Sequence, residues 1–214
     1  MLSTAKSRKL YLLVIPALVI LVTLGLVPVS GLANTYTIYP TADAVVYSGT
    51  YANTNFGNDT VFSTYITGAT TLTYSYSYLK FDLSSIPSSE RITGGTLYAY
   101  CYYVRAGITL TVQLRPVANT SWIESGAGSI TWNNKPAYGN SITSTAGVVG
   151  WDHWTIPAAN LPATGLVSFM LIPATVGGDS RFYSKENGSN KPYLQVTTKK
   201  KPQAAGNNLL LLEE

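Results

Sequence analysis

From Tyr36 onwards, short runs rich in Val, Ile, Thr, Tyr, Phe and Trp alternate with clusters of Gly, Pro, Asn and Ser. No run keeps the period of an amphipathic helix, and short β-forming runs between turn residues are typical of an all-β chain. Strands are predicted over residues 36–39, 44–47, 61–67, 73–82, 96–105, 109–117, 129–132, 141–145, 153–156, 166–172, 181–184 and 193–198. Strands of this number and spacing indicate a two-sheet antiparallel β-sandwich with jelly-roll-like topology.

Two of the predicted strands alternate tyrosine with smaller or apolar residues. Successive side chains of a strand point to opposite faces, so the tyrosines of 73–82 lie opposite Leu79 and those of 96–105 lie opposite Cys101. The two expected outward ladders are Tyr74, Tyr76 and Tyr78 with Lys80, and Tyr98, Tyr100 and Tyr102. Cys101 is thereby predicted to lie in the core, where a thiol behaves as a small apolar side chain.

The first 33 residues have the composition of an export signal. A short basic stretch precedes an almost uncharged apolar run over residues 10–29, and the small residues Gly31 and Ala33 provide a cleavage site before Asn34. A bilayer core requires about 20 residues of helix, so the alternative is an uncleaved N-terminal hydrophobic helix that anchors the chain. In both cases the remainder is expected to be extracellular or on the cell surface.

Charge excludes one class of partner. Removing residues 1–33 takes away three of the 14 basic residues and none of the 10 acidic ones, which leaves 11 basic against 10 acidic. A nearly neutral exported part has no long-range field to attract nucleic acid, so nucleic-acid binding is excluded. We expect one domain over 34–198 and a tail over 199–214, which is either a frayed end or a strand that docks on a neighbour.

The chain has a single cysteine, Cys101, so packing and strand pairing rather than an internal disulfide must stabilise it. Three Asn-X-Ser/Thr sequences lie near turn-forming residues and are candidate glycosylation acceptors. They begin at Asn58, Asn119 and Asn187. They matter only if the source organism glycosylates its exported proteins.

Several separated fragments follow one known β-domain pattern. In chain order they are PTADAVVYSGTYANTNFGNDT (40–60), YLKFDLSSIP (78–87), WIE (122–124), ITWNNKP (130–136), WDHWTI (151–156), RFYSKE (181–186) and PYLQVT (192–197). In this order and spacing the chain resembles the DNRLRE domain, a β-sandwich family grouped with carbohydrate-binding modules and found on secreted bacterial and archaeal proteins. The resemblance implies a non-catalytic module that acts at or outside the cell surface.

The tyrosine ladders are the candidate binding surface. Sugar rings present C–H faces that lie well on flat aromatic rings, and a phenol can bond hydroxyl groups at the rim. The candidate carbohydrate-binding residues are Tyr74, Tyr76, Tyr78, Tyr98, Tyr100, Tyr102 and Trp151. The alternative is that these tyrosines only stabilise strand pairs. Of the other tryptophans, Trp154 is assigned to the core, and Trp122 and Trp132 are read as packing anchors.

Acidic and amide side chains provide a candidate calcium site. Asp43, Asn55 and Glu186 are the expected oxygen ligands of a possible structural calcium ion, and no cofactor is required. Glu124 is a further acidic candidate. The alternative is that Glu124 and Glu186 pair with Lys or Arg side chains.

The sequence gives little support to catalysis. His153 is the only histidine and is read as a half-exposed polar position in a strand. The chain has no Gly-x-Ser-x-Gly motif and no Cys-His pair, because Cys101 is assigned to the core. We therefore expect no enzyme, with a glycosidase carboxylate pair as the minor alternative.

Two functions remain. The first is a carbohydrate-binding module that binds polysaccharide or a cell-surface glycan through surface aromatics. The alternative is a structural subunit of a cell-surface filament or matrix, whose partners are copies of itself and whose donated strand is residues 34–40 or the Leu-rich tail. The sequence does not indicate which glycan is bound.

Overall fold

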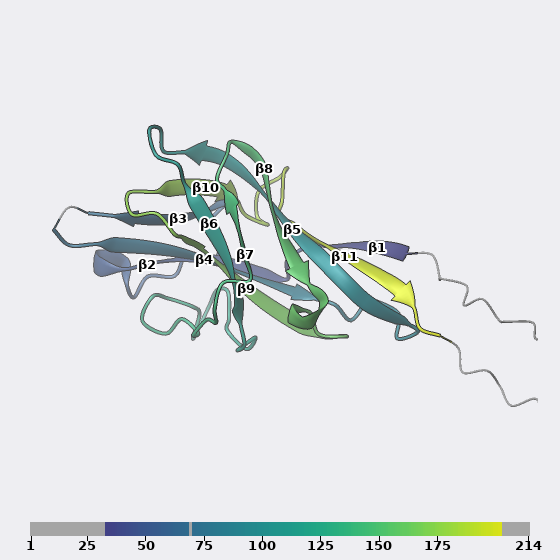
Figure 1. Ribbon diagram of the computed structural model, residues 1–214. Helices are drawn as coiled ribbons and strands as arrows, with labels where there is room; N and C mark the ends of the chain where they lie inside the picture. Colours follow the sequence, from purple (N-terminus) through teal and green to yellow (C-terminus); the bar gives the residue numbers. More distant parts are fainter. Residues whose placement is uncertain (1–32, 69, 203–214) are drawn as a thin grey trace, which may run out of the picture. The chain divides into compact units, whose positions relative to one another are not determined.

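The computed structural model describes residues 33–68 and 70–202, and strands dominate this part of the chain (Figure 1). The strands are β1 (Ala33–Ile38), β2 (Ala42–Tyr47), β3 (Val61–Thr67), β4 (Thr73–Asp82), β5 (Glu90–Val104), β6 (Thr111–Val117), β7 (Thr143–Ala146), β8 (Gly150–Pro157), β9 (Leu166–Pro173), β10 (Asp179–Tyr183) and β11 (Tyr193–Lys200). Two short 3-10 turns, η1 (Gly49–Tyr51) and η2 (Ala158–Asn160), complete the described elements. The all-β prediction is confirmed. The expected N-terminal helix and most of the C-terminal tail lie outside the described residues.

Most predicted strands are present, with shifted ends. β3 and β4 have the predicted bounds, whereas β5 begins at Glu90, six residues before the predicted start at Thr96. The predicted strand over 129–132 is wrong, since this segment contributes only an isolated bridge between Ile123 and Ser129. Its residues have high β-propensity, but no neighbouring strand is available for them to pair with along their length.

The strands form a continuous antiparallel sheet that curls on itself. Its hydrogen-bonded order is β1-β11-β5-β10-β3-β4-β9-β6-β7, with β2 added beside β4 and β8 added beside β5. One half of the sheet is built on β5, with β8 on one side and β11 and β10 on the other. The other half is built on β4, β9 and β6. Pairing through β10 and β3 joins the halves into one sheet. The two-sheet sandwich and its jelly-roll topology stay predictions.

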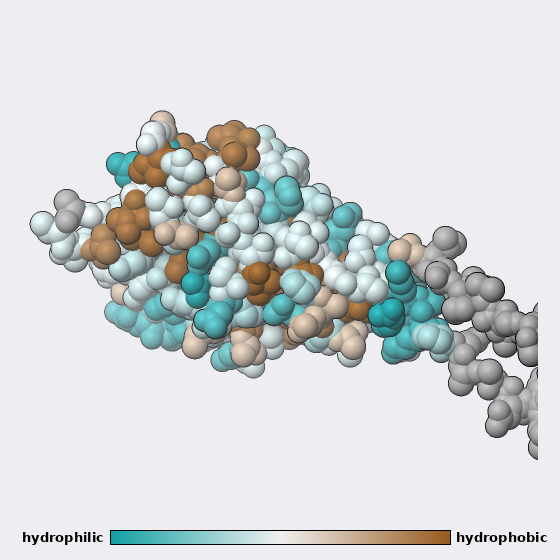
Figure 2. Space-filling view, in the orientation of Figure 1, coloured by the Kyte–Doolittle hydropathy of each residue, from teal (hydrophilic) through white to brown (hydrophobic). Residues whose placement is uncertain are grey.

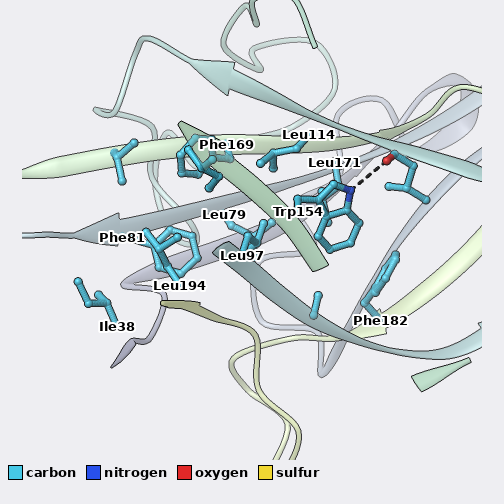
Figure 3. Packing of buried hydrophobic residues seen from close by; sticks show 14 of the residues in the cluster. Ile38, Leu79, Phe81, Leu97, Leu114, Trp154, Phe169, Leu171, Phe182 and Leu194 are labelled. Atoms are coloured by element: carbon cyan, nitrogen blue, oxygen red, sulfur yellow. Dashed lines mark hydrogen bonds between the residues drawn. The ribbon is translucent and has the colours of Figure 1, made fainter. Parts of the chain in front are cut away.

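A large core fills the space between the two halves. Leu97 and Cys101 of β5 and Trp154 of β8 pack in one cluster with Leu79 of β4 and Phe169 of β9. All five are fully buried, which confirms the predicted positions of Cys101 and Trp154. Figure 3 shows Leu97, Trp154 and Phe169 among the packed side chains. The Trp154 indole N–H donates to the Val112 carbonyl oxygen at 2.9 Å, so the ring is hydrogen-bonded as well as packed. Burial raises the pKa of the Cys101 thiol to about 11, so it stays protonated at neutral pH.

A second core covers the outer face of β4. The long segment between β6 and β7, residues 118–142, folds over this face and inserts Trp122 and Ile130 beside Tyr76 and Tyr78. The expected outward ladder of β4 is therefore wrong: Tyr76 is 8% exposed and Tyr78 is fully buried. The Tyr78 hydroxyl donates to the Pro136 carbonyl oxygen at 3.0 Å.

Tyr74, the third residue of that ladder, is also engaged by this segment. It is half-buried and stacks on Trp132 with ring centroids 5.9 Å apart. Lys80, at the other end of the strand, places its ammonium group 4.3 Å from the centre of the Trp122 ring. One face of the fold is thus closed by the protein's own chain.

Exposed aliphatic side chains lie in two loops at the end of the sheet. Val148 and Val149 lie in the β7–β8 loop and Val176 in the β9–β10 loop, and all three are more than half exposed. Figure 2 shows apolar colour over these loops. Among the described residues, no helix combines the length and the apolar character needed to cross a membrane.

Candidate functional site

The outer face of the β5 half is left uncovered by residues 33–68 and 70–202 and carries the second tyrosine ladder. Tyr98, Tyr100 and Tyr102 are half-buried there, opposite the buried Leu97, Ala99 and Cys101, so their expected outward orientation is confirmed. Strand register then adds aromatic neighbours from the adjacent strands. Tyr98 lies between Tyr193 of β11 and His153 of β8, and Tyr100 lies beside Trp151 of β8.

The tyrosine rings on this face stack on one another. Tyr98 and Tyr193 have centroids 4.8 Å apart and planes 16° apart. Tyr183 of β10 stacks on Tyr102 at 4.9 Å and on Tyr100 at 5.8 Å, with planes within 17° in both pairs. Each of these rings therefore has a face covered by its stacked neighbour. The aromatic surface is defined here as Tyr98, Tyr100, Tyr102, Trp151, Tyr183 and Tyr193.

Trp151 is oriented differently from the tyrosines. Its ring is 5.4 Å from Tyr100 at 87° and 5.4 Å from Tyr193 at 64°, so it meets both edge to face. Trp151 belongs to β8 and Tyr193 to β11, and these strands lie on opposite sides of β5. Neighbouring strands are about 4.8 Å apart, so the indole reaches across β5. Trp151 is 41% exposed.

A groove of about 770 Å³ lies beside Trp151. Tyr39, Trp151 and Tyr193 form its aromatic lining, and the β10–β11 loop contributes polar groups at the other side. The polar lining from this loop comprises Lys185, Ser189, Asn190 and Lys191. The volume is within the range of sites that hold small ligands, about 300–1,000 Å³.

Sequence reasoning missed three members of this site: Tyr39, Tyr183 and Tyr193. None of the three belongs to a run in which aromatic residues alternate with others, so no ladder marked them. What brings Tyr183 and Tyr193 to the ladder is the register of β10 and β11 on β5. That register depends on pairing over long sequence separations, and alternation within one strand does not reveal it.

The expected calcium ligands lie in a separate cluster under the β10–β11 loop. Asp43, Glu124 and Glu186 each offer a carboxylate oxygen within 4.8 Å of the others. The Lys185 ammonium lies 3.0 Å from a Glu124 oxygen and also pairs with Glu186. The expected pairing of both glutamates with a lysine is confirmed. Asn55 does not join the carboxylates: its amide donates to the carbonyl oxygens of Glu124 and Ile130, at 2.7 and 2.8 Å.

Asp43 is the buried member of the carboxylate cluster. Its Oδ2 accepts the Lys185 backbone N–H at 2.7 Å, and its own N–H donates to Glu124. Burial raises the pKa of Asp43 to about 8, more than the Lys185 N–H lowers it, and the nearby Glu186 and Glu124 raise it further. One Glu186 oxygen is buried without a hydrogen-bond partner among the described residues. This donor set suits a hard cation such as calcium, although Lys185 already supplies one positive charge. Calcium binding stays a prediction.

The remaining candidate residues are scattered. Asn58 and Asn119 are exposed, whereas Asn187 is half-buried and its side chain accepts the Ser189 N–H at 3.0 Å. His153 is exposed on the aromatic surface side, with its ring 6.1 Å from that of Tyr98. Asp152, the next residue along β8, is buried on the opposite face. The two adjacent titratable groups therefore do not cooperate.

Comparison with known proteins gives two results. Residues 34–198 match the family described as carbohydrate-binding module family 96. The chain is also similar to a gellan lyase from a Bacillus species, at 31% identity over 140 residues, which are 60% of this chain and 6% of the lyase. The chain thus spans a small part of that relative. The expected relation to carbohydrate-binding modules is confirmed, whereas membership of the DNRLRE family stays a prediction. The chain belongs to carbohydrate-binding module family 96.

Proposed function

We propose that the chain is a non-catalytic, extracellular module that binds polysaccharide through the aromatic surface. The observation that carries this proposal is the register of β5, β8, β10 and β11, which gathers six aromatic side chains on one uncovered face. Because the chain belongs to a family of carbohydrate-binding modules, carbohydrate is the ligand class that we assign to this face. Extracellular location follows from the predicted export signal.

The chemistry of the surface suits a sugar chain better than a purely apolar partner. Tyrosine and tryptophan combine an apolar ring with a polar group. Sugar rings have the matching character, since C–H groups and hydroxyls alternate on them. The stacked rings hold each other in place, so little side-chain freedom remains to be lost on binding.

The β4 tyrosines have no part in this proposal. Tyr76 and Tyr78 are buried by the protein's own chain, and Tyr74 stacks on Trp132. Nothing in the described residues favours the filament alternative.

Retention assays test the proposal. The purified protein is run through native gels that contain soluble neutral or acidic polysaccharides, gellan among them, and is mixed with insoluble ones. We expect retention on at least one of them and loss of that retention in the Tyr98→Ala/Tyr102→Ala variant. Tyr51→Ala is the matched control, because Tyr51 is 56% exposed but lies outside the aromatic surface. A wild-type protein that no polysaccharide retains would overturn the proposal.

A further inference from the structure

We infer that Trp151 is the platform on which one sugar ring stacks, and that the groove beside it is the subsite that holds this ring. The ligand is an internal stretch of a polysaccharide, whose neighbouring sugars lie along the stacked tyrosines. This inference rests on the proposed function and divides the aromatic surface into two kinds of group. Trp151 offers a ring face, and the tyrosines offer hydroxyls.

The stacking geometry separates the two kinds of group. Tyr183 has parallel neighbours in both Tyr100 and Tyr102, and Tyr98 has one in Tyr193. A ring whose face is already packed against another ring cannot offer that face to a sugar. Trp151 meets its neighbours at 64° and 87°, so neither of them stacks on the indole. With 41% of its surface exposed, it is the large flat side chain of the aromatic surface that a sugar ring can cover.

The groove supplies hydrogen-bonding groups, which an aromatic platform lacks. A ring lying on Trp151 beside Tyr193 faces the β10–β11 loop, where Ser189, Asn190 and Lys191 line the groove. Their hydroxyl, amide and ammonium groups can bond sugar hydroxyls. A few placed polar groups beside apolar rings are the usual composition of a small-ligand site.

Hydrogen bonds and an ion pair hold the β10–β11 loop in place. The Lys185 backbone N–H bonds to the buried Asp43, and the Lys185 ammonium pairs with Glu124. Further along, the Asn187 side chain accepts the Ser189 N–H at 3.0 Å. These contacts fix both the start and the middle of the loop. The carboxylate cluster therefore acts on the glycan site by positioning the groove wall.

The extent of the aromatic surface favours a chain over a single sugar. Trp151 lies on β8, Tyr100 on β5 and Tyr183 on β10, so the rings span three neighbouring strands. Neighbouring strands are about 4.8 Å apart, so the surface is wider than one sugar ring. A chain seated on Trp151 can thus place further sugars over the tyrosine hydroxyls, which favours binding along the chain.

Fluorescence tests the inference in the wild-type protein. Trp122 and Trp154 are buried, and Trp132 is half-buried where its segment packs on β4. Saturation with the polysaccharide that retains the protein should therefore shift the emission and protect mainly Trp151 from acrylamide quenching. Trp151→Phe should abolish both changes. Quenching that the polysaccharide leaves unaltered in the wild type would overturn the inference.

Variants separate the two roles. Trp151→Ala should weaken retention at least tenfold, Tyr183→Phe about twofold to tenfold because it loses only a hydroxyl, and Tyr51→Ala not at all. Thermal unfolding checks that each variant is folded. If Trp151→Ala does not fold, the acrylamide quenching of the wild-type protein decides whether Trp151 contacts the polysaccharide. Wild-type retention that Trp151→Ala preserves within twofold overturns the inference and leaves the proposed function standing. Absence of retention in the wild type overturns both.

Oligosaccharides of increasing length provide the last part of the test. We expect the affinity for oligosaccharides cut from the retaining polysaccharide to rise with each added sugar until the tyrosine row is covered. A monosaccharide or disaccharide that binds as tightly as the polymer would overturn the extended mode of binding.

Discussion

Asp152 allows a quantitative test of how the strand that carries Trp151 is stabilised. The carboxyl group is 2% exposed, and one of its oxygens accepts the Val148 N–H at 3.2 Å. The other oxygen has no hydrogen-bond partner among the described residues. Burial raises the pKa of Asp152 from 3.8 to about 6, and the Val148 N–H only partly opposes this.

The sign of the stability change follows from the two pKa values. Below about pH 4 the group is protonated in both the folded and the unfolded chain. As the pH rises toward 6 the unfolded chain loses the proton first, so the free energy of unfolding falls. A shift of about two pKa units corresponds to about 3 kcal/mol. Above about pH 6 this loss is complete.

Asp152→Asn removes the titration and keeps an oxygen that can accept the Val148 N–H. We therefore expect the stability of the variant relative to wild type to increase by about 2–3 kcal/mol between pH 4 and pH 8. Any fixed effect of the amide is the same at every pH, and the titration of Asp43 occurs in both proteins and cancels. Urea unfolding, followed by the fluorescence of the buried Trp154, measures the difference. A difference that stays constant from pH 4 to pH 8 would refute the reasoning.

Three further predictions concern residues 118–142, which cover β4, and the carboxylate cluster of Asp43, Glu124 and Glu186. Tyr78→Phe leaves the buried Pro136 carbonyl without its donor, so the free energy of unfolding should fall by about 1–2 kcal/mol; unchanged urea unfolding would contradict this. Gly57→Ala places a Cβ 2.1 Å from the Glu124 carbonyl oxygen, and we expect a loss of about 3 kcal/mol or more in the same assay. Millimolar calcium should raise the melting temperature of the wild type but not that of Asp43→Asn; equal responses would remove the calcium site.

The strands could be predicted because their signal is local. β3 and β4 were found with their bounds from alternation and turn residues alone, and the burial of Cys101 followed from its place in β5. The carboxylate cluster could be predicted in part. Asp43 and Glu186 do lie together, but Asn55 serves instead to hold the backbone of Glu124 and Ile130. Residue type alone does not decide between those two roles.

The error at β4 has a physical reason. Tyr76 and Tyr100 have the same alternating context, and strand periodicity assigns both to a face away from the main core. Which of the two faces is then covered depends on residues 118–142, a segment of turns and one isolated bridge. A segment without a repeating pattern carries no periodic signal of where it packs. The sequence therefore predicts the β4 strand but not the burial of its tyrosines.

The contrast between the two faces is itself an argument for a ligand at β5. On β4 the tyrosine row is satisfied by the chain: Tyr78 bonds to Pro136, and Tyr74 stacks on Trp132. On β5 the equivalent row is flanked by other surface aromatics and by Arg181 beside Tyr102, and Trp151 remains 41% exposed. Aromatic rings gathered on an uncovered face mark a place of contact with a partner. A sugar chain laid over Trp151 and the tyrosine hydroxyls would give the β5 face the kind of cover that residues 118–142 give the β4 face.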